Sequence, residues 1–298
     1  MKNFFLLMIF LFLPLFCLAE NADLFPVYDE TSGKWGYQNT TGQWVIPPSF
    51  DEAEPFLNSY ACVSVDKNQH AYNRYGIINI DGRMIVPPEY YIYNDNGDEE
   101  TPSDLYVVSL VGGTPLSGFF DTKSGVYSGL KWHEVLGRMT CDHLVPVLDK
   151  NGRAGYASRV TGELVIPCRY EGVFPGAFSQ GVAVAAYADG TGEYFLMDEE
   201  GNIISLPDGI TAVYAALAQN DRIVIQETET QLYGYADLSG RIVIPPRFTT
   251  ASDFENGMAR VEENGTVFHI DTQGNSVDTE TLPQNICLPS CIFFGTVV

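Results

Sequence analysis

The sequence predicts an all-β protein built from about seven repeats, each a β-hairpin unit of roughly 40 residues. Three observations support this fold class. A pattern of an aromatic residue followed by glycine keeps returning, and a turn glycine follows each copy a few residues later. Beyond the first 19 residues, no apolar period of 3.6 residues persists over the length of a helix.

The clearest copy of the unit begins at Trp35. Trp35 and Tyr37 alternate with Gly36, the period of two that places both aromatic side chains on one face of a strand. Gly36, inside a strand, indicates a bulge or a close approach of neighbouring backbone. Gly42 ends a run of turn-forming residues and can adopt the positive φ that a hairpin loop requires.

Two further strands complete the unit. Residues 44–46 form the return strand, and Pro47 and Pro48 are expected to end its ladder because proline donates no backbone hydrogen bond. A leading strand at residues 24–29 is echoed at residues 144–149, so it belongs to the repeat.

The same positions can be followed along the chain. The aromatic-glycine positions fall at Trp35, Tyr75, Ser117, Ala154, Tyr194, Tyr233 and Val267. The positions that the repeat is expected to need for its backbone are Trp35, Gly36, Gly42, Gly76, Gly82, Gly155, Gly162, Gly234 and Gly240.

These units resemble the WG repeat, also called the KWG repeat, of bacterial proteins. Lys34, Trp35, Gly36 and Tyr37 make the cleanest copy, and the resemblance covers nearly the whole chain from residue 24 to about residue 277. It implies a β-rich repeat module found in extracytoplasmic and other contexts. It implies no enzyme and brings no catalytic residues.

Units of this size fit two architectures, a closed propeller-like ring or an open β-solenoid. Seven units is a number of blades that can close a propeller ring, so we expect the closed arrangement for a single domain at residues 20–277. The apolar tail at 278–298 is expected to add a strand at 292–298 that closes the ring or caps the last unit.

Residues 1–19 are expected to be a signal peptide, because one lysine precedes an apolar run that ends in small residues. An uncleaved membrane anchor and a lipoprotein cysteine at Cys17 are the weaker alternatives. Cleavage would leave an exported protein, whether periplasmic, at the cell surface or secreted, with no membrane span.

The net charge of −22 excludes binding to nucleic acid or to an anionic membrane by charge alone. Five cysteines follow the signal segment, an odd number that does not make a disulfide framework, although Cys287 and Cys291 could pair.

Sites of chemistry are weakly indicated. Cys141 with His143 is a close pair but lacks the second pair of a zinc site. The inserted loop with Asp95, Asp98, Glu99 and Glu100 lacks the alternating order of a calcium loop, and it is expected to be a solvated insertion and a candidate partner loop. We therefore expect no catalytic residue, metal or cofactor.

Two functions from different classes remain open. The first is a non-catalytic recognition module outside the cytoplasm, with an unidentified protein or glycan partner, since repeated β units offer large loop surfaces. The alternative is a glycan-acting hydrolase or lyase with carboxylates gathered on one loop face.

Overall fold

The computed structural model describes residues 23–65, 74–94, 104–110, 115–137, 143–171, 177–188, 193–214, 216–278 and 294–295. These residues form antiparallel strands and no α-helix, which confirms the all-β prediction. Within them, no helix has the length and apolar character needed to cross a membrane.

The strands belong to six antiparallel sheets, which follow one another in chain order. The first sheet contains β1 (Phe25–Asp29), β2 (Lys34–Gln38) and β3 (Trp44–Phe50). The second contains β4 (Glu52–Ala53), β5 (Tyr60–Ser64), β6 (Tyr75–Asn79), β7 (Met84–Asn94), β8 (Leu105–Leu110), β9 (Ser117–Asp121) and β10 (Val126–Tyr127).

Four smaller sheets follow. The third contains β11 (Glu134–Val135), β12 (Leu144–Leu148), β13 (Ala154–Ser158) and β14 (Leu164–Tyr170), and the fourth contains β15 (Val182–Ala186), β16 (Tyr194–Asp198) and β17 (Ile203–Ile204). The fifth contains β18 (Ile210–Ala212), β19 (Ile223–Glu227), β20 (Tyr233–Ala236) and β21 (Ile242–Phe248). The sixth contains β22 (Thr250–Ala251), β23 (Met258–Glu263), β24 (Thr266–Asp271), β25 (Ser276–Val277) and β26 (Phe294–Gly295).

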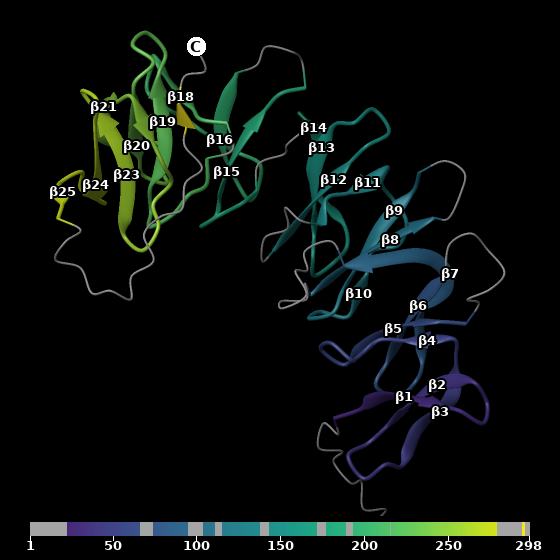
Figure 1. Ribbon diagram of the computed structural model, residues 1–298. Coiled ribbons are helices and arrows are strands. Elements are labelled where there is room, and N and C mark those ends of the chain that lie inside the picture. The colour runs from purple at the N-terminus through teal and green to yellow at the C-terminus, as the bar shows by residue number, and fades with distance from the viewer. Residues whose placement is uncertain are drawn as a thin grey trace, which may run out of the picture.

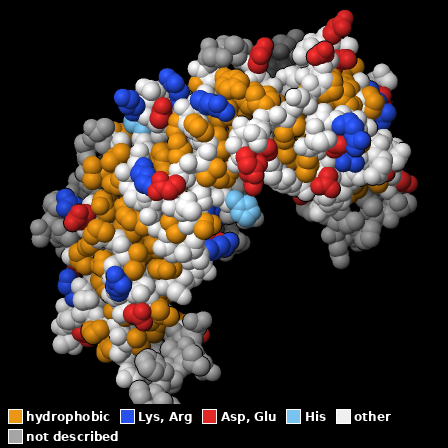
Figure 2. Space-filling model, turned by 180° about the vertical axis from the view of Figure 1, so that it is seen from behind, with side chains coloured by type: hydrophobic (Ala, Val, Ile, Leu, Met, Phe, Trp, Pro, Cys, Tyr) orange, Lys and Arg blue, Asp and Glu red, His pale blue; other side chains and the backbone are white. Residues whose placement is uncertain are grey.

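The sheets lie along an open arc, with β1 to β3 at one end and β23 to β25 at the other (Figure 1). The described residues therefore do not form the closed ring that a count of seven units favours. Figure 2 shows apolar side chains in patches along the body of this arc, with charged side chains between them. In the tail, β26 pairs antiparallel with β22 and so extends the sixth sheet at its edge.

The return strand differs from expectation at its prolines. β3 does not end at Pro47 but continues through both prolines to Phe50, and the register shifts between Tyr37 paired with Ile46 and Trp35 paired with Phe50. The two prolines lie inside this bulge, where no ladder hydrogen bond is required of them. The same shift occurs between β6 and β7, between β13 and β14, and between β20 and β21.

The glycine of the aromatic-glycine pattern lies under this bulge. A Cβ added to Gly36 would stand 2.6 Å from the carbonyl oxygen of Ile46 and 2.7 Å from the nitrogen of Pro48. Gly76, Gly155 and Gly234 have the corresponding return-strand backbone at 2.5 to 2.9 Å. The site admits no side chain at all, which explains why glycine recurs there.

The core of a regular unit is a buried tyrosine that reaches into the following linker. The Tyr37 hydroxyl donates to the carbonyl of Glu54 at 2.8 Å, and its ring lies 4.7 Å from that of Phe56 between ring centroids. Tyr235 repeats both contacts, with the carbonyl of Ser252 at 2.8 Å and the ring of Phe254 at 4.8 Å. Tyrosines at this position thus join the first and sixth hairpins to the linkers that follow them.

The hairpin turns are held by an acidic or amide side chain and a glycine. Asp237 accepts from the amides of Ser239 and Arg241, and hydrogen bonding led by the Ser239 hydroxyl lowers the pKa of Asp237 to about 2. Gly240 follows with φ of +82°, which favours glycine. The turn glycines Gly42, Gly82, Gly162 and Gly274 also have positive φ.

Candidate functional site

The regular geometry is interrupted between β7 and β8. β7 has 11 residues and runs beyond the bulge to pair with β8, which fuses two units into one sheet. Near its end Tyr91 is 45% exposed, and its ring lies 5.4 Å from that of Tyr93. The acidic residues Asp95, Asp98, Glu99 and Glu100 come next in the chain and lie outside the described residues. The tyrosine pair therefore stands at the base of the candidate partner loop.

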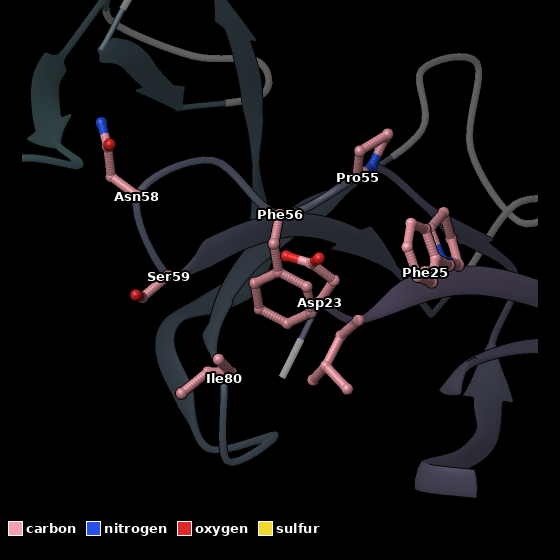
Figure 3. Close-up of a pocket in the computed structure, with 9 residues that line it drawn as sticks. Asp23, Phe25, Pro55, Phe56, Asn58, Ser59 and Ile80 are labelled. Atoms are coloured by element: carbon pink, nitrogen blue, oxygen red, sulfur yellow. The ribbon is translucent and has the colours of Figure 1, made fainter. Parts of the chain in front are cut away.

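A pocket of about 490 Å³ lies at the N-terminal end of the arc. Figure 3 shows the ring of Phe56 at its centre with the Asp23 carboxylate beside it. Asn58 and Ser59 line the opposite side, and Phe25 borders the pocket from β1. An aromatic ring next to a carboxylate offers a ligand a stacking surface and a hydrogen-bond acceptor. The Asn58 amide donates instead to Asp104 at 2.7 Å and to Thr122 at 3.0 Å.

The pocket has a counterpart between the fifth and sixth sheets, where the turn that precedes β19 packs against the linker after β21. There, the Leu217 amide donates to the carboxylate of Asp253 at 3.2 Å, and the Gly257 amide donates to the side chain of Asn220 at 3.1 Å. In the first unit the equivalent residues directly precede β1, and those before Asp23 lie outside the described residues.

Asp253 is a half-buried acid between the fifth and sixth sheets, and its pKa lies near neutrality. Burial raises the pKa of Asp253 to about 7, and the amide of Leu217, which donates to the carboxylate, opposes that rise. Among the described residues, burial and the Leu217 amide account for this pKa without a second carboxylate, so Asp253 does not form an acid pair of the kind that glycosidases use.

A buried ion pair joins the second sheet to the third. Arg159 donates from Nε to the Asp121 carboxylate at 2.6 Å, and both side chains are at least nine-tenths buried. Ser124 completes the site, since its amide donates to Asp121 at 2.7 Å and its hydroxyl donates to the carbonyl of Arg159. Every charge here has a partner, so the cluster holds units together and offers no reactive group.

The described residues hold few of the metal-ligand and cysteine positions that were considered from the sequence. Within the described ranges, no three potential metal ligands converge. Cys141, Cys287 and Cys291 lie outside those ranges, and Cys62 and Cys168 are free thiols. The pocket residues Asp23, Phe56, Asn58 and Ser59 were not predicted. The recurrence of phenylalanine two residues before a tight turn, at 56–59, 178–181 and 254–257, was the signal that could have pointed to them.

Together these features define an array of β-hairpin units that stack through shared aromatic and glycine positions. The family model described as "WG containing repeat" matches residues 35–68, 75–92, 155–186 and 233–266. The chain therefore contains WG repeats in these four stretches. None of the curated proteins matches it.

Solved structures show only slight similarity. The computationally designed Ika8 protein is 15% identical over 86% of this chain and 83% of its own, with a TM-score of 0.36. BamB from Moraxella catarrhalis is 12% identical over 74% of this chain and 72% of its own, with a TM-score of 0.32. TM-scores this low support no argument about function.

Proposed function

We propose that this chain is an exported, non-catalytic recognition module, a scaffold of seven WG-type units that presents a partner-binding surface at the β7–β8 insertion. The matched family repeats occupy four of these units, and antiparallel hairpins at the other three positions support counting them as copies. The apolar segment at the start of the sequence supports export.

The observation that carries the proposal is the exposed ring of Tyr91, which lies beside the half-buried Tyr93 where β7 ends before the acidic insertion. The tyrosines that pack against the following linker in regular units lie buried, as Tyr37 and Tyr235 do. Tyr91 instead keeps 45% of its surface exposed where the strand is prolonged by an insertion. Tyrosine offers rigid contact area with a polar end, which suits recognition of a protein or a glycan.

The test measures binding and cleavage on one set of samples. We expect the exported protein to retain a defined polysaccharide or an exported protein partner, with no release of new reducing ends from the polysaccharide. Changing Tyr91→Ala or deleting residues 95–100 should weaken retention at least tenfold while the melting temperature stays unchanged, because Tyr91 is 45% exposed and residues 95–100 fall between β7 and β8.

The matched control neutralises acids in a regular turn, with Glu199→Gln and Glu200→Gln. These residues are exposed or half-exposed on the β16–β17 turn, so the control removes charge without touching the insertion. Retention should remain as in the wild type. Reducing ends released by the wild type would instead favour the hydrolase or lyase alternative, and binding unaffected by the Tyr91 change would contradict the proposed surface.

A further inference from the structure

Two asparagines of the chain stand in the pattern Asn-x-Thr, in which x is not proline. One is Asn39, in residues 39–41, and the other is Asn264, in residues 264–266. Enzymes that attach glycans to asparagine recognise this pattern, and their acceptor asparagines lie in surface loops of exported proteins. The pattern alone does not select an acceptor, because the asparagine side chain must also be free to reach the enzyme.

The Asn39 side chain is held by its own turn. Its carbonyl oxygen accepts from the amide of Thr41 at 3.1 Å, from the hydroxyl of Thr41 at 2.7 Å and from the amide of Gln43 at 3.0 Å. Asn39 is also partly buried. The asparagine and the threonine hydroxyl of this pattern are therefore both used to close the β2–β3 turn, and Asn39 can extend toward an enzyme only if these hydrogen bonds break.

The Asn264 side chain lies at the tip of the β23–β24 hairpin. Glu263 is opposite Thr266, so Asn264 and Gly265 form a two-residue turn, with φ of +52° and +77°. Positive φ at both residues is the type I′ geometry that Asn-Gly favours. Asn264, Gly265 and Thr266 are all exposed. Among the residues that the structure describes, none makes a hydrogen bond with the Asn264 side chain.

The hairpin presents this tip without involving it in the core. β23 and β24 are paired from Met258 opposite Asp271 to Glu263 opposite Thr266, and Val261 and Ile270 are fully buried in the hairpin. A Cβ built on Gly265 has no heavy atom within 4 Å, so there is open space around the turn. A group attached at Asn264 can therefore extend into solvent without moving a packed side chain.

We propose that the side-chain nitrogen of Asn264 is an acceptor for an N-linked glycan and that Asn39 in the folded protein is not. The donor is an oligosaccharide joined to a lipid through pyrophosphate. The amide nitrogen forms a bond to the anomeric carbon, and the bond from that carbon to the pyrophosphate oxygen breaks. The bonding electron pair leaves with the pyrophosphate, and the amide proton passes to a base of the transferring enzyme.

In the cell this modification rests on one part of the function proposed above, the export of the chain, because acceptor asparagines occur in exported proteins. It does not involve Tyr91 or the β7–β8 insertion. The test is therefore designed so that its result depends on neither export nor partner binding.

The test adds the purified, folded full chain to a lipid-linked oligosaccharide and an oligosaccharyltransferase that requires only Asn-x-Ser or Asn-x-Thr. Mass spectrometry of protease fragments then gives the modified fraction at each asparagine. We expect the oligosaccharide on Asn264, and at least tenfold less modification of Asn39. Thr266→Ala should abolish the transfer to Asn264 and leave the melting temperature unchanged, because Thr266 is exposed at the turn.

The matched controls are two synthetic peptides, residues 34–44 and 259–269, in which no fold holds either asparagine. Both peptides should be modified at similar rates, so the difference between Asn39 and Asn264 should arise only in the folded chain. Folded protein that stays unmodified at Asn264, or that is modified equally at Asn39, would overturn the proposal, as would a 259–269 peptide that accepts no glycan. A chain that is never exported but is modified at Asn264 in this assay would contradict the proposed function and leave the acceptor assignment standing.

Discussion

Replacing Gly234 with alanine should destabilise the protein although it adds only one methyl group. The new Cβ would stand 2.5 Å from the carbonyl oxygen of Ile244, 2.7 Å from the nitrogen of Pro246 and 2.9 Å from the carbonyl carbon of Pro245. All three atoms are backbone, so no side-chain rotation relieves the contact. The β20–β21 bulge must move instead.

Overpacking of this kind costs about 1 to 3 kcal/mol, and the rigid neighbours place Gly234→Ala in the upper half of that range. For a chain of this size, a loss of ~2 to 3 kcal/mol corresponds to a drop in melting temperature of roughly 5 to 10 °C. Circular dichroism during heating measures this drop. Hydrogen exchange should show that amide protection is lost first in β20 and β21.

The control changes a glycine that has open space. Gly257 has φ of +80° and no heavy atom within 4 Å of an added Cβ, and asparagine tolerates this conformation. Gly257→Asn should therefore melt within about 2 °C of the wild type. Equal melting of Gly234→Ala and the wild type would refute the steric argument, as would an equal loss in both variants.

Two further predictions concern buried charge. Asp253 carries a raised pKa of about 7, so between pH 4 and 7 the folded state holds a proton that the unfolded state has released, and stability falls as pH rises through this window. Asp253→Asn should remove that dependence in urea unfolding, by up to about 4 kcal/mol at pH 8, and an unaltered pH profile would contradict it. Arg159→Ala should cost about 3 to 5 kcal/mol because Asp121 is left buried and charged, whereas Arg159→Met with Asp121→Leu should recover most of that loss.

Much of the repeat could be read from the sequence because its signals are local. The strand of Trp35 and Tyr37 and the turn of Gly42 depend on residues within ten positions of one another, and the structure contains both. The behaviour of Pro47 and Pro48 was predicted wrongly, because a proline ends a ladder only where a hydrogen bond is needed. The bulge that removes this need depends on Gly36 in another strand.

The pocket and the open arc could not be read in this way. The pocket joins residues 23–26 to residues 55–59, and nothing local marks Asp23 as a neighbour of Phe56. Whether the units close into a ring depends on the small rotation between successive sheets, which arises from how side chains such as Ala183 fill the space beneath Tyr156. No spacing in the sequence encodes that rotation.

The first and last units of the array differ from the internal units in the residues that they present to their neighbours. Tyr37, Tyr156 and Tyr235 share core clusters with the leading strand of the unit that follows. Internal units therefore have a neighbour on both sides. The terminal units do not. In the last described unit, His269 stands at the position that Tyr37 has in the first unit and Tyr235 has in the sixth. Phe25 is 51% exposed at a position whose equivalents in the later units are at most 5% exposed, so the first described sheet presents an apolar surface of a kind that the later units bury.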